Sequence, residues 1–132
     1  AELLEAAGGL KESGAEKMIS GGPMMGFSMF DLNVPITKTN SSLLCLSSDD
    51  VSHLEPSACI NCGRCVEACP EMLVPSRLAK QANLQLGEEF EQWNGMECIE
   101  CGSCSFICPA RRPLAQSIKT MKKDILAARR KK

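Results

Sequence analysis

Eight of the nine cysteines in this chain of 132 residues stand in two runs of identical spacing. Each run has gaps of two, two and three residues, and a proline follows its last cysteine. The runs are Cys59, Cys62, Cys65, Cys69, Pro70 and Cys98, Cys101, Cys104, Cys108, Pro109. Corresponding cysteines are 39 residues apart, so the runs form an internal repeat. Thiols at such regular gaps either pair with one another or bind metal, and this choice decides the fold.

The spacing matches the C-x2-C-x2-C-x3-C-P run that holds 4Fe-4S clusters in bacterial two-cluster ferredoxins. Three thiolates at two-residue gaps can surround one cluster, while the fourth lies beyond the loop, where we expect it near the start of a departing helix. In two-cluster ferredoxins that fourth cysteine ligates the other cluster. We therefore predict two 4Fe-4S clusters, one held by Cys59, Cys62, Cys65 and Cys108, the other by Cys98, Cys101, Cys104 and Cys69.

Zinc and disulfides fit the pattern less well. Structural zinc uses separated pairs of cysteines and has no use for a third at the same gap. A disulfide framework needs an oxidising compartment, and we find no export signal. The ninth cysteine, Cys45, lies in an apolar stretch and is predicted to be a small packed residue. His53, the only histidine, is predicted to lie at the surface.

The net charge of −1 conceals a strong asymmetry. Residues 1–110 carry 6 basic and 15 acidic side chains, whereas residues 111–132 carry 9 basic side chains and one acid. We interpret the basic segment from Lys119 to Lys132 as a surface for an acidic partner or an anionic membrane face, with a solvated helix end as the alternative. Aromatic residues make up only 4% of the chain, which argues against nucleic-acid binding. No apolar run is long enough to span a bilayer.

Pattern and turn residues divide the chain into two predicted domains, 1–50 and 51–132, because the stretch 47–57 is polar and resembles a linker. We expect helices over 2–7, 75–86 and 113–130, with Gly87 ending the second, and strands over 17–20 and 42–46. The loop 21–26 lacks a phosphate-binding motif and is predicted to be a tight turn. The fold class is mainly α.

Three segments together resemble the C subunit of the Rnf ion-translocating ferredoxin:NAD oxidoreductase: 19–26 (ISGGPMMG), 34–38 (VPITK) and 58–70 (ACINCGRCVEACP). The resemblance implies that 1–50 is the end of a β-grasp domain of the soluble-ligand-binding (SLBB) type and 51–132 a two-cluster ferredoxin-like domain. It also implies an upstream part, absent from this chain, that carries FMN and NAD. Because the sequence lacks an initiator methionine, we expect it to be a piece of a longer protein.

The resemblance further implies that the chain relays electrons between this flavin and other subunits of a membrane complex, with ferredoxin as a further partner. The location would be the cytoplasmic face of the bacterial inner membrane, bound peripherally. We expect no catalytic residues in the chain, and neither NADH oxidation nor flavin binding by the chain alone.

One departure from the family pattern keeps a second reading open. The segment Asn40–Ser42 differs from the usual Thr-Gly turn, which leaves a related flavin and iron–sulfur cobalamin reductase as an alternative. We also consider an iron–sulfur structural or sensing module and a zinc-binding interaction module.

Overall fold

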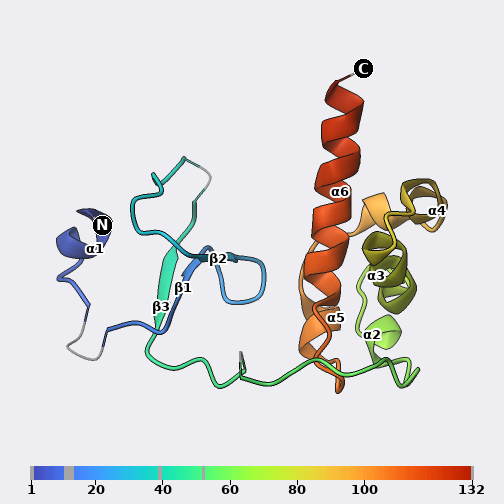
Figure 1. Cartoon of the computed structure of the whole chain (residues 1–132), viewed down its shortest axis with the longest axis horizontal. Helices are drawn as coiled ribbons and strands as arrows, with labels where there is room; N and C mark the ends of the chain where they lie inside the picture. The colour runs from blue at the N-terminus through green and yellow to red at the C-terminus, as the bar shows by residue number, and fades with distance from the viewer. Residues whose placement is uncertain (1, 11–13, 39, 52, 132) are drawn as a thin grey trace. The chain divides into compact units, whose positions relative to one another are not determined.

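The computed structural model of the chain describes residues 2–10, 14–38, 40–51 and 53–131 (Figure 1). The contacts divide the chain between Leu54 and Glu55 into two units, which are described separately. Among the described residues, no helix has the length and apolar character needed to cross a membrane.

The first unit contains a short helix and a three-stranded antiparallel sheet. The helix α1 spans Glu2–Ala6, and the strands β1 (Lys17–Ser20), β2 (Phe27–Met29) and β3 (Leu43–Leu46) lie in the order β2-β1-β3. Met18 of the central strand lies opposite Met29 on one side and Cys45 on the other. The predicted strands over 17–20 and 42–46 are thus confirmed, whereas β2 was not predicted. A strand of three residues is too short to show an alternating pattern, and here β1 supplies its pairing through the connecting turn.

The turn between β1 and β2 is made possible by glycine. Gly21 adopts a φ of +103°, which favours glycine, and a Cβ on Gly26 would lie 2.6 Å from the carbonyl oxygen of Gly22. The amide of Gly26 donates a hydrogen bond of 2.8 Å to that same oxygen. The loop 21–26 is therefore the tight turn that the sequence predicted.

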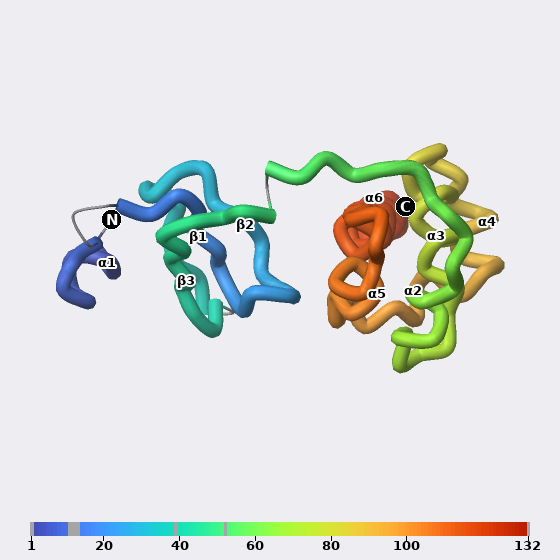
Figure 2. Tube along the Cα trace, turned by 90° about the horizontal axis from the view of Figure 1, so that it is seen from below, coloured from blue at the N-terminus to red at the C-terminus, as the bar shows by residue number. Residues whose placement is uncertain are grey.

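The second unit consists of helices packed on one long C-terminal helix. Its elements are α2 (Arg64–Glu67), α3 (Pro75–Asn83), α4 (Gly87–Gln92), a single 3-10 turn η1 (Gly95–Glu97), α5 (Ser103–Phe106) and α6 (Leu114–Arg130). Helix α3 lies along α6, and α2 and α5 lie near one end of α6, away from the C-terminus (Figures 1 and 2). The most deeply buried side chains of this unit, Leu78, Phe90 and Ile118, come from α3, α4 and α6.

The apolar periodicity correctly placed the two main helices of this unit. Pro75 occupies the first turn of α3 and Pro113 precedes α6, positions where a missing amide proton costs nothing. The expectation that Gly87 ends a helix over 75–86 is wrong: α3 ends at Asn83, Gln85 turns with a φ of +57°, and Gly87 begins α4. Helix α4 was missed because it presents only one buried side chain, Phe90, and so has no repeating stripe.

We expect Gly95→Ala to destabilise the second unit. Phe90 is fully buried, and a Cβ on Gly95 would lie closer to three of its ring carbons than van der Waals contact allows. Overpacking of this kind costs about 1–3 kcal/mol. A cost of 1 kcal/mol lowers the midpoint of thermal unfolding by about 4–8 °C in a domain of this size.

Gly87→Ala is the matched control, because its added Cβ would only touch Ile125 at 3.9 Å. It should leave the midpoint unchanged or raise it slightly. Thermal unfolding followed by circular dichroism compares the two variants. Equal midpoints would contradict a rigid contact between Gly95 and Phe90.

Candidate iron–sulfur sites

The two cysteine runs fold into the same backbone structure. Gly63 and Gly102 precede α2 and α5 with left-handed φ angles of 78° and 83°. In each repeat the third cysteine lies inside this short helix. The fourth follows its end, where the amide of Cys69 donates to Val66 O (3.1 Å) and that of Cys108 to Ser105 O (3.3 Å). The internal repeat of the sequence is therefore also a repeat in the fold.

The fourth cysteines do not lie near the starts of departing helices, so that expectation is wrong. Cys69 comes directly after the C-cap residue of α2, and Cys108 directly after that of α5. The following helices begin several residues later, at Pro75 and Leu114. The prolines after each fourth cysteine explain the gap, because the residue before a proline is biased away from the helical conformation.

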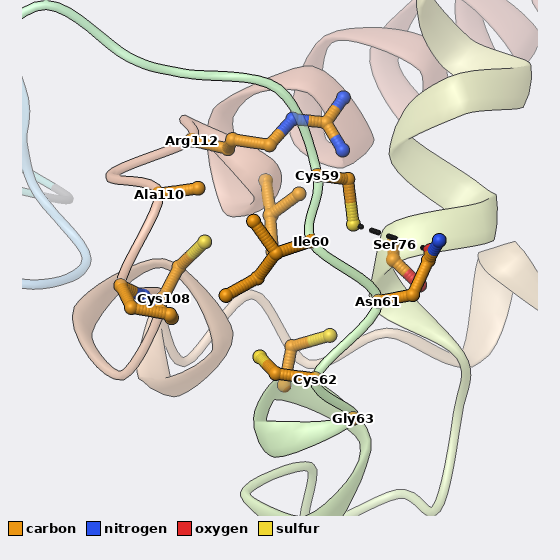
Figure 3. Close-up of a pocket in the computed structure, with 12 residues that line it drawn as sticks. Cys59, Ile60, Asn61, Cys62, Gly63, Ser76, Cys108, Ala110 and Arg112 are labelled. Carbon is orange, nitrogen blue, oxygen red and sulfur yellow. Dashed lines mark hydrogen bonds between the residues drawn. The ribbon is translucent and has the colours of Figure 1, made fainter.

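One cavity, of about 130 Å³, is surrounded by the first three cysteines of the first repeat and the last cysteine of the second. Figure 3 shows the sulfur of Cys108 facing the segment that carries Cys59 and Cys62. The Cys59 thiol is turned along its own loop, toward Asn61 Oδ1 at 3.6 Å (Figure 3). Residues lining this cavity include Cys59, Cys62, Cys65, Cys108, Ser76 and Arg112.

A second cavity, of about 20 Å³, has the reciprocal composition. It is surrounded by the first three cysteines of the second repeat and the last cysteine of the first. Residues lining this cavity include Cys69, Cys98, Cys101, Cys104, Glu71 and Glu100. Each cavity thus draws three thiols from one repeat and the fourth from the other. Among the described residues, no three histidine, cysteine or acidic side chains converge as a single metal ion would require.

The cysteine side chains form part of the hydrophobic core. Cys65 and Cys104 are buried in the same cluster of side chains as Leu78 and Ile118, and Cys69, Cys98 and Cys108 pack against this cluster. By contrast, Cys59 and Cys62 are exposed. All nine cysteines are free thiols in the structure. The first cavity is consequently open to solvent, whereas the second is more enclosed.

Burial changes the acidity of two thiols in the second cavity. The pKa of Cys104 is raised to about 11, first by burial and then by the nearby Cys98, Cys101 and Cys69 thiols, against a hydrogen bond from the amide of Ser105. Burial also raises the pKa of Cys98, against the amide of Glu100 and the positive charge of Lys122. The influence of Cys69 on both pKa values agrees with its place at this cavity.

A group of charged side chains beside the second cavity was not predicted as part of a site. Lys122 of α6 donates a hydrogen bond of 2.5 Å to the carbonyl oxygen of Cys98 and lies 3.3 Å from Oε1 of Glu100. Lys119 lies 3.7 Å from the other carboxylate oxygen of Glu100. The position of Glu100 between two cysteines was a signal available in the sequence. Nothing in the sequence links it to Lys122, which lies 24 residues from Cys98.

Other residues singled out in the sequence lie away from the cavities. Cys45 is half-buried in β3. The His53 side chain is 70% exposed, as predicted, and lies 3.0 Å from Glu16. In the basic segment Arg129 pairs with Glu91 at 2.6 Å. Part of this segment is therefore engaged within the chain.

Comparison with known proteins now identifies the class. Residues 52–109 match the family described as a 4Fe-4S dicluster domain. Together with the paired cysteine cavities, this match defines an iron–sulfur protein whose dicluster domain follows a small antiparallel sheet.

Curated relatives identify the chain more closely, and all three named here are C subunits of ion-translocating oxidoreductase complexes. The chain is 44% identical over 115 residues to that of the Na(+)-translocating ferredoxin:NAD(+) oxidoreductase complex of Acetobacterium woodii, covering 87% of this chain and 26% of the relative. Identity to that of the proton-translocating complex of Clostridium ljungdahlii is 42% over 128 residues, covering 96% and 28%. Identity to that of the ion-translocating oxidoreductase complex of Methanosarcina acetivorans is 35% over 126 residues, covering 95% and 28%. The chain is a homologue of these Rnf-type C subunits, as the resemblance predicted, and spans about a quarter of their length.

In the metal-free chain, we expect iodoacetamide to modify Cys59 and Cys62 well before Cys98 and Cys104. The first pair is exposed, whereas burial shields the second pair and disfavours its reactive thiolate. Because the pKa of Cys104 is raised, its reaction should accelerate as the pH rises toward about 11. Mass spectrometry of peptides from a time course measures each rate.

Denatured chain provides the control, since all four cysteines should then react at similar rates. Similar rates in the folded chain at neutral pH would contradict the difference in enclosure between the two cavities.

Proposed function

We propose that the chain conducts electrons through two 4Fe-4S clusters as part of the C subunit of an ion-translocating ferredoxin:NAD oxidoreductase complex. One observation carries the proposal: two cavities each surrounded by three cysteines of one repeat and the fourth of the other. The clusters supply one-electron chemistry, because each takes up and releases a single electron. Two adjacent clusters favour conduction, since a structural or sensing role requires only one.

The residues present fit such groups chemically. Cys59, Cys62, Cys65 and Cys108 would hold one cluster, and Cys98, Cys101, Cys104 and Cys69 the other. Thiolates are the usual protein ligands of these clusters, and both cavities offer four. Cys59 must turn away from Asn61 to ligate a cluster. The second cavity is small and must widen as its thiols deprotonate and bind.

The wider assignment rests on the relatives, whose names describe subunits of ferredoxin:NAD(+) oxidoreductase complexes. We propose that the first unit is the end of a β-grasp (SLBB) domain and that an upstream part carries FMN and NAD. The clusters would then pass electrons between that flavin and other subunits, with ferredoxin as a further partner. The assembly would sit peripherally on the cytoplasmic face of the inner membrane. The relatives are named for different ions, so the likeness assigns no coupled ion.

Anaerobic reconstitution with ferrous iron and sulfide tests the proposal. The loaded chain should be brown, contain about eight iron and eight sulfide atoms per chain, and undergo reversible reduction by dithionite. A colourless chain that binds zinc instead would overturn it in favour of an interaction module. Clusters that bind but cannot be reduced reversibly would favour a structural or sensing role.

Substitution of single cysteines tests the exchange of fourth ligands. Cys69→Ser should alter the electron paramagnetic resonance signal that Cys98→Ser also alters, and leave the other signal largely intact. Cys108→Ser should likewise share its target with Cys59→Ser. The reason is that each fourth cysteine lies at the cavity of the other repeat.

Cys45→Ser is the control, because this cysteine lies in β3 and outside both cavities. It should change neither signal. If Cys69→Ser and Cys59→Ser damage the same cluster, each repeat holds its own cluster and the proposed pairing is wrong.

The end of α6 provides a separate test of docking. Lys123, Arg130 and Lys131 are exposed, whereas Lys122 and Arg129 make contacts within the chain. Changing the three exposed residues to glutamine should weaken association with anionic vesicles or with membranes that contain the complex. The expected loss is about 1 kcal/mol per charge near an anionic surface.

Co-sedimentation over a range of salt concentrations measures this loss, and Lys80→Gln on α3 serves as the control for an exposed lysine elsewhere. Unchanged association at low salt would mean that these residues form only a solvated helix end.

A further inference from the structure

We infer that Lys122, together with its partner Glu100, sets the reduction potential of the cluster at the second cavity. The inference rests on the proposed function and deepens it. It assigns to Lys122 a positive charge that favours the reduced state of this cluster, and to Glu100 a negative charge that opposes it. Lys122 acts through the cysteine loop and is a positioning residue.

The contacts of Lys122 place its charge at the cysteine loop. Its side chain is only 14% exposed and that of Glu100 only 27%. The ammonium group donates to the carbonyl oxygen of Cys98, and the backbone amide of Glu100 donates to the sulfur of Cys98 at 3.4 Å. One side chain from α6 therefore anchors the loop 98–101 at both a cysteine and the residue whose amide contacts its sulfur.

The first repeat has no counterpart of this pair. Counting back 39 residues, Asn61 stands at the position of Glu100 and Asn83 at that of Lys122, and both are neutral. The backbone is nevertheless the same, with φ of 54° at Asn61 and 59° at Glu100. The charged pair is therefore an addition to the second site that its backbone does not require.

The direction of the effect follows from electrostatics. Reduction adds one negative charge to a group already surrounded by thiolates, so a nearby cation stabilises the reduced form and raises the potential. Partial burial weakens the screening by solvent and salt. Because Lys119 also approaches Glu100, two cations share one carboxylate, and the local charge is positive. Glu71 also lines this cavity, but it is exposed and better screened.

The test is a redox titration of the loaded chain, with dithionite as the electron donor and both cluster potentials followed by electron paramagnetic resonance. Lys122→Gln should lower one potential, shifting its reduction equilibrium by about tenfold, which is about 59 mV for one electron. Glu100→Gln should raise the same potential. The double variant should return close to the parent value, because the two charges are removed together.

Three further variants assign and control the shifts. Lys122→Arg keeps the charge and should keep the potential close to that of the parent, even if Lys122→Gln fails to assemble its cluster. Lys123→Gln removes an exposed charge one residue away and should change neither potential. Arg112→Gln should lower only the other potential, because Arg112 lines the first cavity.

The outcomes separate this inference from the proposed function. A chain that binds no reducible clusters overturns the proposed function. Two reversible potentials that do not move in Lys122→Gln overturn the inference alone. Shifts of the same sign in Lys122→Gln and Glu100→Gln also overturn it, because they would indicate that the pair only supports the loop.

Discussion

The second unit depends on the crossing of its two cysteine repeats. Each repeat forms a loop with a left-handed glycine, a one-turn helix and a fourth cysteine that lies at the cavity of the other repeat. A chain that folds in this way must bring residues 59–70 and 98–109 together before either cavity is complete. The long helices α3 and α6, which follow the repeats, then pack against each other.

The cavities and the hydrophobic core are parts of one structure. Cys65 and Cys104 belong to the same buried cluster as Leu78, Phe90 and Ile118. In the proposed holoprotein, ligation therefore adds to the same packing that α3 and α6 provide, and binding of the clusters contributes to the free energy of folding. The unit of 78 residues is small, and domains of this size bury a limited apolar surface.

A common backbone with different surroundings gives the two sites different properties. The first cavity is bordered by exposed cysteines and by Arg112, whereas the second is half-buried and lies beside Lys122 and Glu100. Burial disfavours added negative charge, as the raised pKa of Cys104 shows for its own thiolate. A cation beside the more buried site offsets part of this cost. A duplicated motif can in this way supply two electron carriers that respond separately to their surroundings.

The sequence by itself determined the class of the protein and most of its local structure. Cysteine spacing is set by covalent geometry and the size of the bound group, so the family match and the two reciprocal sets of cysteines could be anticipated. Periodicity placed α3 and α6, and a glycine pair placed the turn before β2. Only the tertiary structure decided that the fourth cysteines follow α2 and α5, that Gly87 begins a helix, and that Lys122 reaches Cys98. Those features depend on contacts between residues distant in the sequence, where no local propensity acts, because packing rather than pattern chooses which side chain meets which loop.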